Sequence, residues 1–144
     1  AKSLSVVFGG GIITGADGAQ GEPALFGKPN RWIDYSGPIY TERKLNEPAE
    51  QILFEGLTLI DHKSNPSHPA SWHVREDGWI GPSLSRNASL LVPRDQPLTC
   101  RYLLYVHSGT CDAEKANRLA DQFDQSPVLR VQKGTRPHHQ FEIV

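Results

Sequence analysis

The sequence predicts a mainly β protein, an antiparallel β-sandwich with one packed α-helix. Thirteen glycines and eleven prolines are many for 144 residues. They separate short runs in which apolar and polar residues alternate, which is typical of strands joined by turns. Helical periodicity occurs in one segment only, near residues 112–125. A chain of this length fits one domain with one core, so residues 1–144 are expected to fold together.

The first strands follow from composition. Residues 3–8 contain β-branched side chains and precede three glycines, so they predict a short strand, which residues 12–14 continue or pair with. Residues 15–23 are too rich in glycine and proline for a ladder and predict a loop. Residues 32–38 alternate and place Trp32 and Asp34 on one face, where Asp34 caps a turn or faces a ligand.

Residues 41–50 are charged and predict a surface crossing. Residues 51–61 form the clearest strand, in which the apolar phase shifts at Gly56. A glycine at such a shift predicts a β-bulge. The strand would then end at Asp61 and His62.

Further strands and one helix complete the pattern. The helix is expected from Asp112, a suitable N-cap, to Gln125, with an apolar stripe that packs on the sheet. Ser126 and Pro127 would close it. The expected strands are residues 79–83, 89–92, 99–107, 128–131 and 140–144.

Charge and composition exclude several classes of protein. The formal net charge is -1 and no Lys/Arg run is present, which disfavours nucleic acid as a partner. No apolar run approaches the ~20 residues of a membrane span, so a soluble protein without a membrane partner is expected. Strand spacing separates Cys100 from Cys111 and predicts two free thiols, which favours a reducing compartment and hence the cytoplasm.

Residues 61–81 concentrate the chemistry. They contain three of the six histidines and two of the three tryptophans. Prolines at 66 and 69 restrict the loop between His62 and Trp72, so the segment is expected to be preorganised at a sheet rim. If His73 and Arg75 lie in a strand, they point to the same side and Trp72 to the other.

Acid/base chemistry on a sugar is one interpretation of this stretch. His62 or His73 would carry the proton, because histidine titrates near neutral pH. Arg75 would stabilise developing negative charge and Asp61 would orient a histidine. These four residues are the predicted catalytic set, and they must converge on one cavity.

Three alternatives remain open. Binding without catalysis would use Trp72 or Trp79 as a stacking platform, although Trp79 is expected to fill the core. A metal site built from Asp61 and the histidines of this stretch matches no compact signature, so no metal or other cofactor is predicted. A purely structural role is the third alternative. The predicted substrate-binding residues are Trp72, Asn65, His68 and Asp34.

Several motifs together resemble the later half of the DUF6807 family, also labelled PmoA-like. They are residues 32–38, the pattern Asp61-His62-x-Ser64-Asn65-Pro66-x-x-Pro69-x-x-Trp72-His73-Val74-Arg75-x-x-Gly78, residues 101–104 and residues 107–109. The resemblance covers roughly residues 1–125. It implies a β-sandwich associated with carbohydrate-processing enzymes, with site roles at Asp61, His62, Asn65, Trp72, His73 and Arg75.

The family's earlier half, with a His-His-Arg-Gly type motif, has no counterpart here. The resemblance therefore implies either a shortened relative or half of a larger sandwich, completed by a second chain or in a homo-oligomer. The sequence as a whole predicts a carbohydrate-acting subunit that performs elimination or hydrolysis on a glycoside or modified sugar. The alternatives are a non-catalytic sugar-binding or assembly subunit of a two-chain enzyme and a metal-dependent enzyme.

Overall fold

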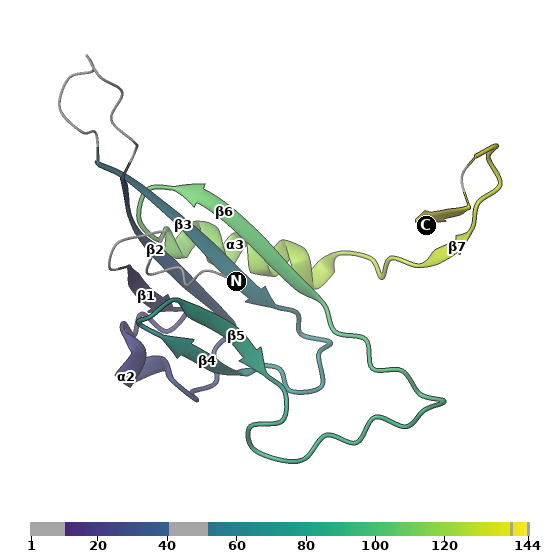
Figure 1. Ribbon diagram of the computed structural model, residues 1–144, viewed down its shortest axis with the longest axis horizontal. Coiled ribbons are helices and arrows are strands. Elements are labelled where there is room, and N and C mark those ends of the chain that lie inside the picture. The colour runs from purple at the N-terminus through teal and green to yellow at the C-terminus, as the bar shows by residue number, and fades with distance from the viewer. Residues whose placement is uncertain (1–10, 41–51, 139, 144) are drawn as a thin grey trace.

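The computed structural model describes residues 11–40, 52–138 and 140–143, and its centre is a four-stranded antiparallel sheet (Figure 1). The strand order is β1-β2-β3-β6. The bounds are Ile12–Gly15 for β1, Trp32–Tyr40 for β2, Ile52–Asp61 for β3 and Tyr102–Ser108 for β6. The expected strand at 3–8 and the crossing at 41–50 lie outside the described residues.

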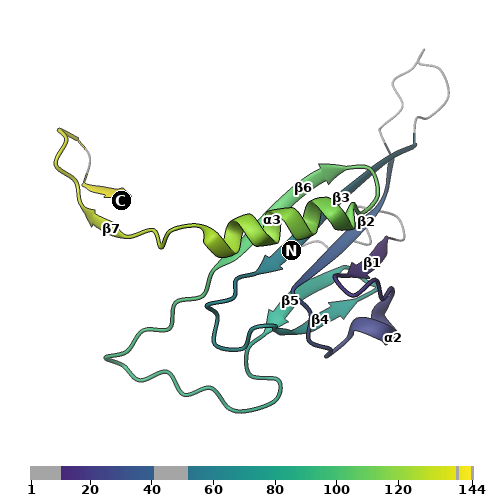
Figure 2. The ribbon, with the colours of Figure 1, turned by 180° about the vertical axis from the view of Figure 1, so that it is seen from behind.

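A different layer covers each face of this sheet (Figures 1 and 2). The hairpin of β4 (Ser71–Arg75) and β5 (Trp79–Ser83) packs on one face, where Ile33 and Tyr35 of β2 meet Trp72 and Val74 of β4. The helix α3 (Ala113–Gln125) packs on the other. The buried residues on that side are Trp32, Ile60, Ala116 and Ala120. The predicted mainly β fold with one packed helix is confirmed.

The start of α3 follows from its capping residue. Asp112 accepts a hydrogen bond from the backbone N–H of Lys115 at 2.9 Å, which satisfies one of the free donors of the first turn. Ala116 and Ala120 are buried one turn apart on the sheet side. Ser126 is the C-cap in extended conformation. The predicted helix is therefore confirmed to within one residue.

Some elements differ from the prediction. A short helix, α2 (Glu22–Leu25), occupies part of the expected loop, with proline in its first turn, where a missing N–H costs nothing. Residues 89–92 form no strand. The strands β7 (Val131–Lys133) and β8 (Phe141–Ile143) pair in a hairpin that lies away from the sheet (Figure 1). Cys100 and Cys111 are free thiols, as predicted.

The predicted β-bulge at Gly56 is wrong. β3 pairs with β2 without interruption from Tyr40↔Ile52 to Trp32↔Ile60. The glycine has a steric cause instead, because an added Cβ would lie 2.5 Å from Cε1 of His107 and 2.7 Å from Cβ of Ser36. His107 reaches across β3 to a carboxylate of β2, and only a glycine leaves room for its ring.

The strand β6 has one neighbour, β3, among the described strands. Leu104 and Val106 on this strand are 56% and 69% exposed, although both lie in a strand with apolar character. Exposed apolar strands at a sheet edge are typical of association surfaces. Completion of the sheet by a second chain stays a prediction.

We expect Gly56→Ala to destabilise the protein by about 1–3 kcal/mol, because the added methyl group overpacks the space that holds the His107 ring. Gly81→Ala is the matched control in another strand, since no atom lies within 4 Å of the added Cβ. Urea unfolding followed by circular dichroism measures both free energies. Equal stability of the two variants would contradict the steric explanation.

Candidate functional site

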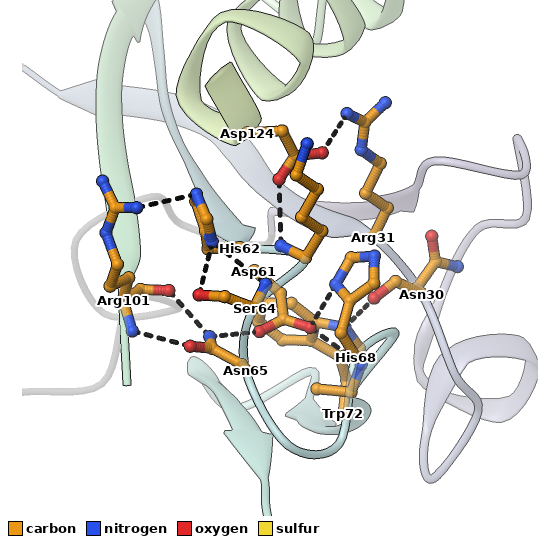
Figure 3. A network of polar contacts seen from close by, with 12 residues as sticks. Asn30, Arg31, Asp61, His62, Ser64, Asn65, His68, Trp72, Arg101 and Asp124 are labelled. Atoms are coloured by element: carbon orange, nitrogen blue, oxygen red, sulfur yellow. Dashed lines mark hydrogen bonds and ion pairs between the residues drawn. The ribbon is translucent and has the colours of Figure 1, made fainter. Parts of the chain in front are cut away.

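The carboxylate of Asp61 lies at the end of β3 and is wholly buried. Its Oδ1 accepts a hydrogen bond from Nδ2 of Asn65 at 2.7 Å. Its Oδ2 accepts from the backbone N–H of Ala70 at 3.0 Å and lies 2.9 Å from Nδ1 of His68. Since a carboxylate can only accept, His68 carries its proton on Nδ1 in this pair, and Nε2 faces away (Figure 3).

Asn65 connects the loop between β3 and β4, residues 62–70, to the residue that precedes β6. Its Nδ2 also donates to the backbone oxygen of Arg101 at 2.7 Å, and its Oδ1 accepts from the backbone N–H of Arg101 at 2.8 Å. The side chain therefore imitates the pairing of a neighbouring strand. The 62–70 loop and Arg101, which are far apart in the sequence, are thereby held in a fixed position relative to each other (Figure 3).

His62 is buried between the loop and α3. A guanidinium N–H of Arg101 lies 2.9 Å from Nε2, and Nδ1 accepts from the backbone N–H of Ser64 at 3.0 Å and lies 2.8 Å from Oγ of the same serine. The ring of Phe123 packs against it at 4.8 Å between centroids. Burial and the charge of Arg101 lower the pKa of His62. The neutral imidazole is a structural acceptor in this network.

Asp124 of α3 fastens the same loop to the helix. It accepts from the backbone N–H of Lys63 at 2.9 Å and from the guanidinium of Arg31 at 2.7 Å (Figure 3). Burial alone would raise the pKa of Asp124, but these two donors hold it below its usual range. Both ends of the loop are thus tied to surrounding elements.

A cavity of about 300 Å³ lies beside this loop. Its polar lining consists of hydroxyl and amide side chains, and none of the described residues that line it is charged. The polar members are Ser67, Ser71, Ser83, Asn87 and Ser89, and the others are Pro29, Pro66, Pro69, Leu84, Ala88 and Leu90. Asn87 donates to Oγ of Ser71 at 3.1 Å. Oγ of Ser67 is buried and has no hydrogen-bond partner in the described part of the chain.

The structure divides the predicted catalytic set. Asp61 and His62 belong to the buried network, whereas His73 and Arg75 are exposed on the outer face of the hairpin, which covers the opposite side of the sheet from α3. Arg75 binds Asp77 through Nε at 2.9 Å. The expected convergence of all four residues on one cavity is therefore wrong. Asp61 does orient a histidine, but it is His68.

The two tryptophans exchange their expected positions. Trp72 is wholly buried, and its indole N–H donates to the backbone oxygen of Asn30 at 2.7 Å, so it has no free face for a ligand. Trp79, expected in the core, is 60% exposed. Alternation along β4 and β5 places the two rings on opposite faces of the hairpin.

Asp34 lies apart from this site, on the α3 face of the sheet with Trp32, as the alternation predicts. Its Oδ2 accepts from Oγ1 of Thr58 and lies 2.7 Å from Nε2 of His107. Burial, followed by the negative charge of Asp34, raises the pKa of Cys111 to about 12. A thiol with this pKa stays protonated at neutral pH, so it is unsuited to nucleophilic catalysis.

Sequence reasoning missed Asn87, which lines the cavity, and Arg101, which belongs to the buried network beside it. Asn87 belongs to a glycosylation-like triplet, Asn87-Ala88-Ser89, which gave no indication of a pocket. Arg101 occurs in one of the family motifs, but its contact with His62 depends on the pairing of β3 with β6. Among the described residues, no group of three or more His, Cys, Asp or Glu side chains is placed to hold a metal ion.

Comparison with known families agrees with the motif resemblance. The model of DUF6807, a family of unknown function, matches residues 2–121. The chain belongs to the DUF6807 family. No curated protein and no solved structure matches this DUF6807 chain. Within the described residues, its helices lack the length and apolar character of a membrane span.

We expect the stability of the chain to fall as pH falls below about 6.5, the ordinary histidine value. The unfolded chain binds a proton there more readily than the folded chain, in which the pKa of His62 is lowered, so acid favours unfolding. His62→Gln should give a flatter dependence of the free energy of unfolding on pH. Urea titrations across pH 5–8 measure both slopes, and an unchanged slope in the variant would contradict the assignment.

Proposed function

We propose that this DUF6807 chain is a carbohydrate-binding subunit that holds a neutral sugar in the cavity beside the 62–70 loop. The observation that carries the proposal is the uncharged, hydrogen-bonding lining of that cavity, with the buried Oγ of Ser67 left without a partner. Buried polar groups are nearly always paired in folded proteins. Ser67 lines the cavity, so rotation of its side chain about χ1 would bring Oγ to a ligand hydroxyl that supplies the missing partner.

The chemistry of the lining favours a neutral polyol over an ion. Hydroxyl and amide groups both donate and accept, which suits a ligand whose own hydroxyls do the same. A charged ligand would lose its hydration without gaining an opposite charge from the described lining. The volume of about 300 Å³ is at the small end of ligand pockets and suits a single sugar unit.

The cavity is also preorganised. Ser67 lies between Asn65 and His68, which the buried carboxylate of Asp61 holds in place. On the opposite wall, the bond from Asn87 to Ser71 joins the 84–90 loop to β4. A site whose walls are already ordered loses less conformational entropy when the ligand binds.

A catalytic function is the second candidate, and the Asp61–His68 pair favours it. A buried carboxylate that accepts from Nδ1 orients the ring and leaves Nε2 to exchange a proton, as in other acid/base sites. The His68 side chain is 21% exposed, so its ring is not sealed in the core. Elimination or hydrolysis of a glycoside would then use His68 in place of the predicted His62 and His73.

We expect isothermal titration calorimetry to detect binding of at least one of glucose, galactose and mannose or their methyl glycosides. Ser67→Ala should weaken that binding roughly tenfold, because one hydrogen bond contributes on the order of 1 kcal/mol. Ser85→Ala is the matched control, since Ser85 lies in the same loop region as Asn87 but does not line the cavity.

Two outcomes would change the proposal. Absence of binding by every neutral sugar in the panel would contradict it. Turnover of nitrophenyl glycosides that is lost in His68→Gln would replace it with the catalytic candidate, because a binding subunit has no use for a proton carrier.

A further inference from the structure

The outer face of the β4–β5 hairpin presents six residues on one side. The antiparallel register pairs Ser71 with Ser83, His73 with Gly81 and Arg75 with Trp79. Because side chains alternate across a strand, these pairs share the face opposite to Trp72, Val74 and Ile80, which pack inward.

Trp79 is the one tryptophan of the chain that is exposed, since Trp32 and Trp72 are wholly buried. An indole that is 60% exposed leaves much of its apolar surface in water, where the apolar face of a ligand ring can reach it. Beside it on the same face, no atom lies within 4 Å of a Cβ built on Gly81. Open space therefore lies next to the ring.

The polar neighbours of Trp79 are fixed in place. The guanidinium of Arg75 is held by both oxygens of Asp77, at 2.9 and 3.0 Å, which also balance its charge. The ring of His73 packs edge-on between Trp79 at 6.5 Å and Phe26 at 5.1 Å. The guanidinium of Arg86 lies over the Phe26 ring, with its Cζ 4.6 Å from the ring centroid.

This face continues into the cavity. Ser71 and Ser83, the last pair of the ladder, are both part of the cavity lining. Four residues of strand separate Trp79 from Ser83, a span of about 13 Å. A surface of this length leads from the exposed ring, past His73 and the open space at Gly81, to the cavity.

We propose that the outer face of β4–β5 is an extended subsite for an oligosaccharide chain, with one sugar unit in the cavity and a later unit stacked on Trp79. This inference rests on the proposed function of the cavity. The indole suits the apolar C–H face of a sugar ring, while His73 and Arg75 can hydrogen-bond its hydroxyls. The balanced charge of Arg75 favours a neutral chain over an anionic one.

The test compares one sugar unit with a chain of four. Calorimetry is run with glucose and mannose and with cellotetraose, maltotetraose and mannotetraose. We expect one tetrasaccharide to bind at least tenfold more tightly than its monosaccharide. Trp79→Ala should remove that gain and leave monosaccharide binding unchanged.

Two variants and a spectrum sharpen the result. Gly81→Val fills the open space on the platform and should also weaken the tetrasaccharide selectively. Phe141→Ala, which removes an exposed ring elsewhere, is the matched control and should change neither affinity. Tetrasaccharide should shift the tryptophan fluorescence of the unaltered chain but not that of Trp79→Ala.

The possible failures are distinguishable. If monosaccharides bind but tetrasaccharides gain nothing, or if Trp79→Ala keeps the gain, the extended subsite is overturned and the cavity proposal stands. If no sugar binds at all, the proposed function fails and the subsite fails with it.

Discussion

The buried carboxylate of Asp61 is the constraint on which the rest of the site depends. A charge taken out of water costs several kcal/mol unless it is paired and hydrogen-bonded. Here Asn65, His68 and Ala70 donate to both of its oxygens. In this conformation of the loop all three donors reach the carboxylate, which ties the path of the chain into β4 to the end of β3.

This path has two consequences for function. It fixes Pro66, Ser67 and Pro69 in the wall of the cavity. It also sets the phase in which the chain enters β4, with Trp72 and Val74 toward the core and His73 and Arg75 outward. The polar stretch at 61–81 therefore divides into two parts. Its first part forms the buried network that shapes the 62–70 loop, and its second part forms the outer face of the β4–β5 hairpin, which is open to a ligand.

Much of the fold is readable from local pattern. Alternation in residues 32–38 predicted that Trp32 and Asp34 share a face, and a capping aspartate with an apolar stripe predicted α3. The same alternation could show that Trp72 and Trp79 lie on opposite faces of the hairpin, but it could not show which of the two rings is buried. That choice depends on which face of the hairpin meets β2, and this is decided by contacts between distant segments.

The site was less predictable for the same reason. The cavity is assembled from residue 29, the 66–71 segment and the 83–90 segment, and none of these carries a sequence pattern for binding. The role of Gly56 depends on His107, more than fifty residues further along the chain. Residue types indicated the polar character of the loop correctly, but the pairing of its histidines required the structure.

Native-state hydrogen exchange at the backbone amide of Ala70, followed by NMR, tests most directly whether Asp61 organises the site. Ala70 follows a proline-rich loop, yet its N–H donates to the buried carboxylate. The account predicts that this amide exchanges as slowly as the amides of β2 and β3, since it opens only when the core opens. Exchange at the rate of a freely accessible loop amide would show that the carboxylate does not hold the loop.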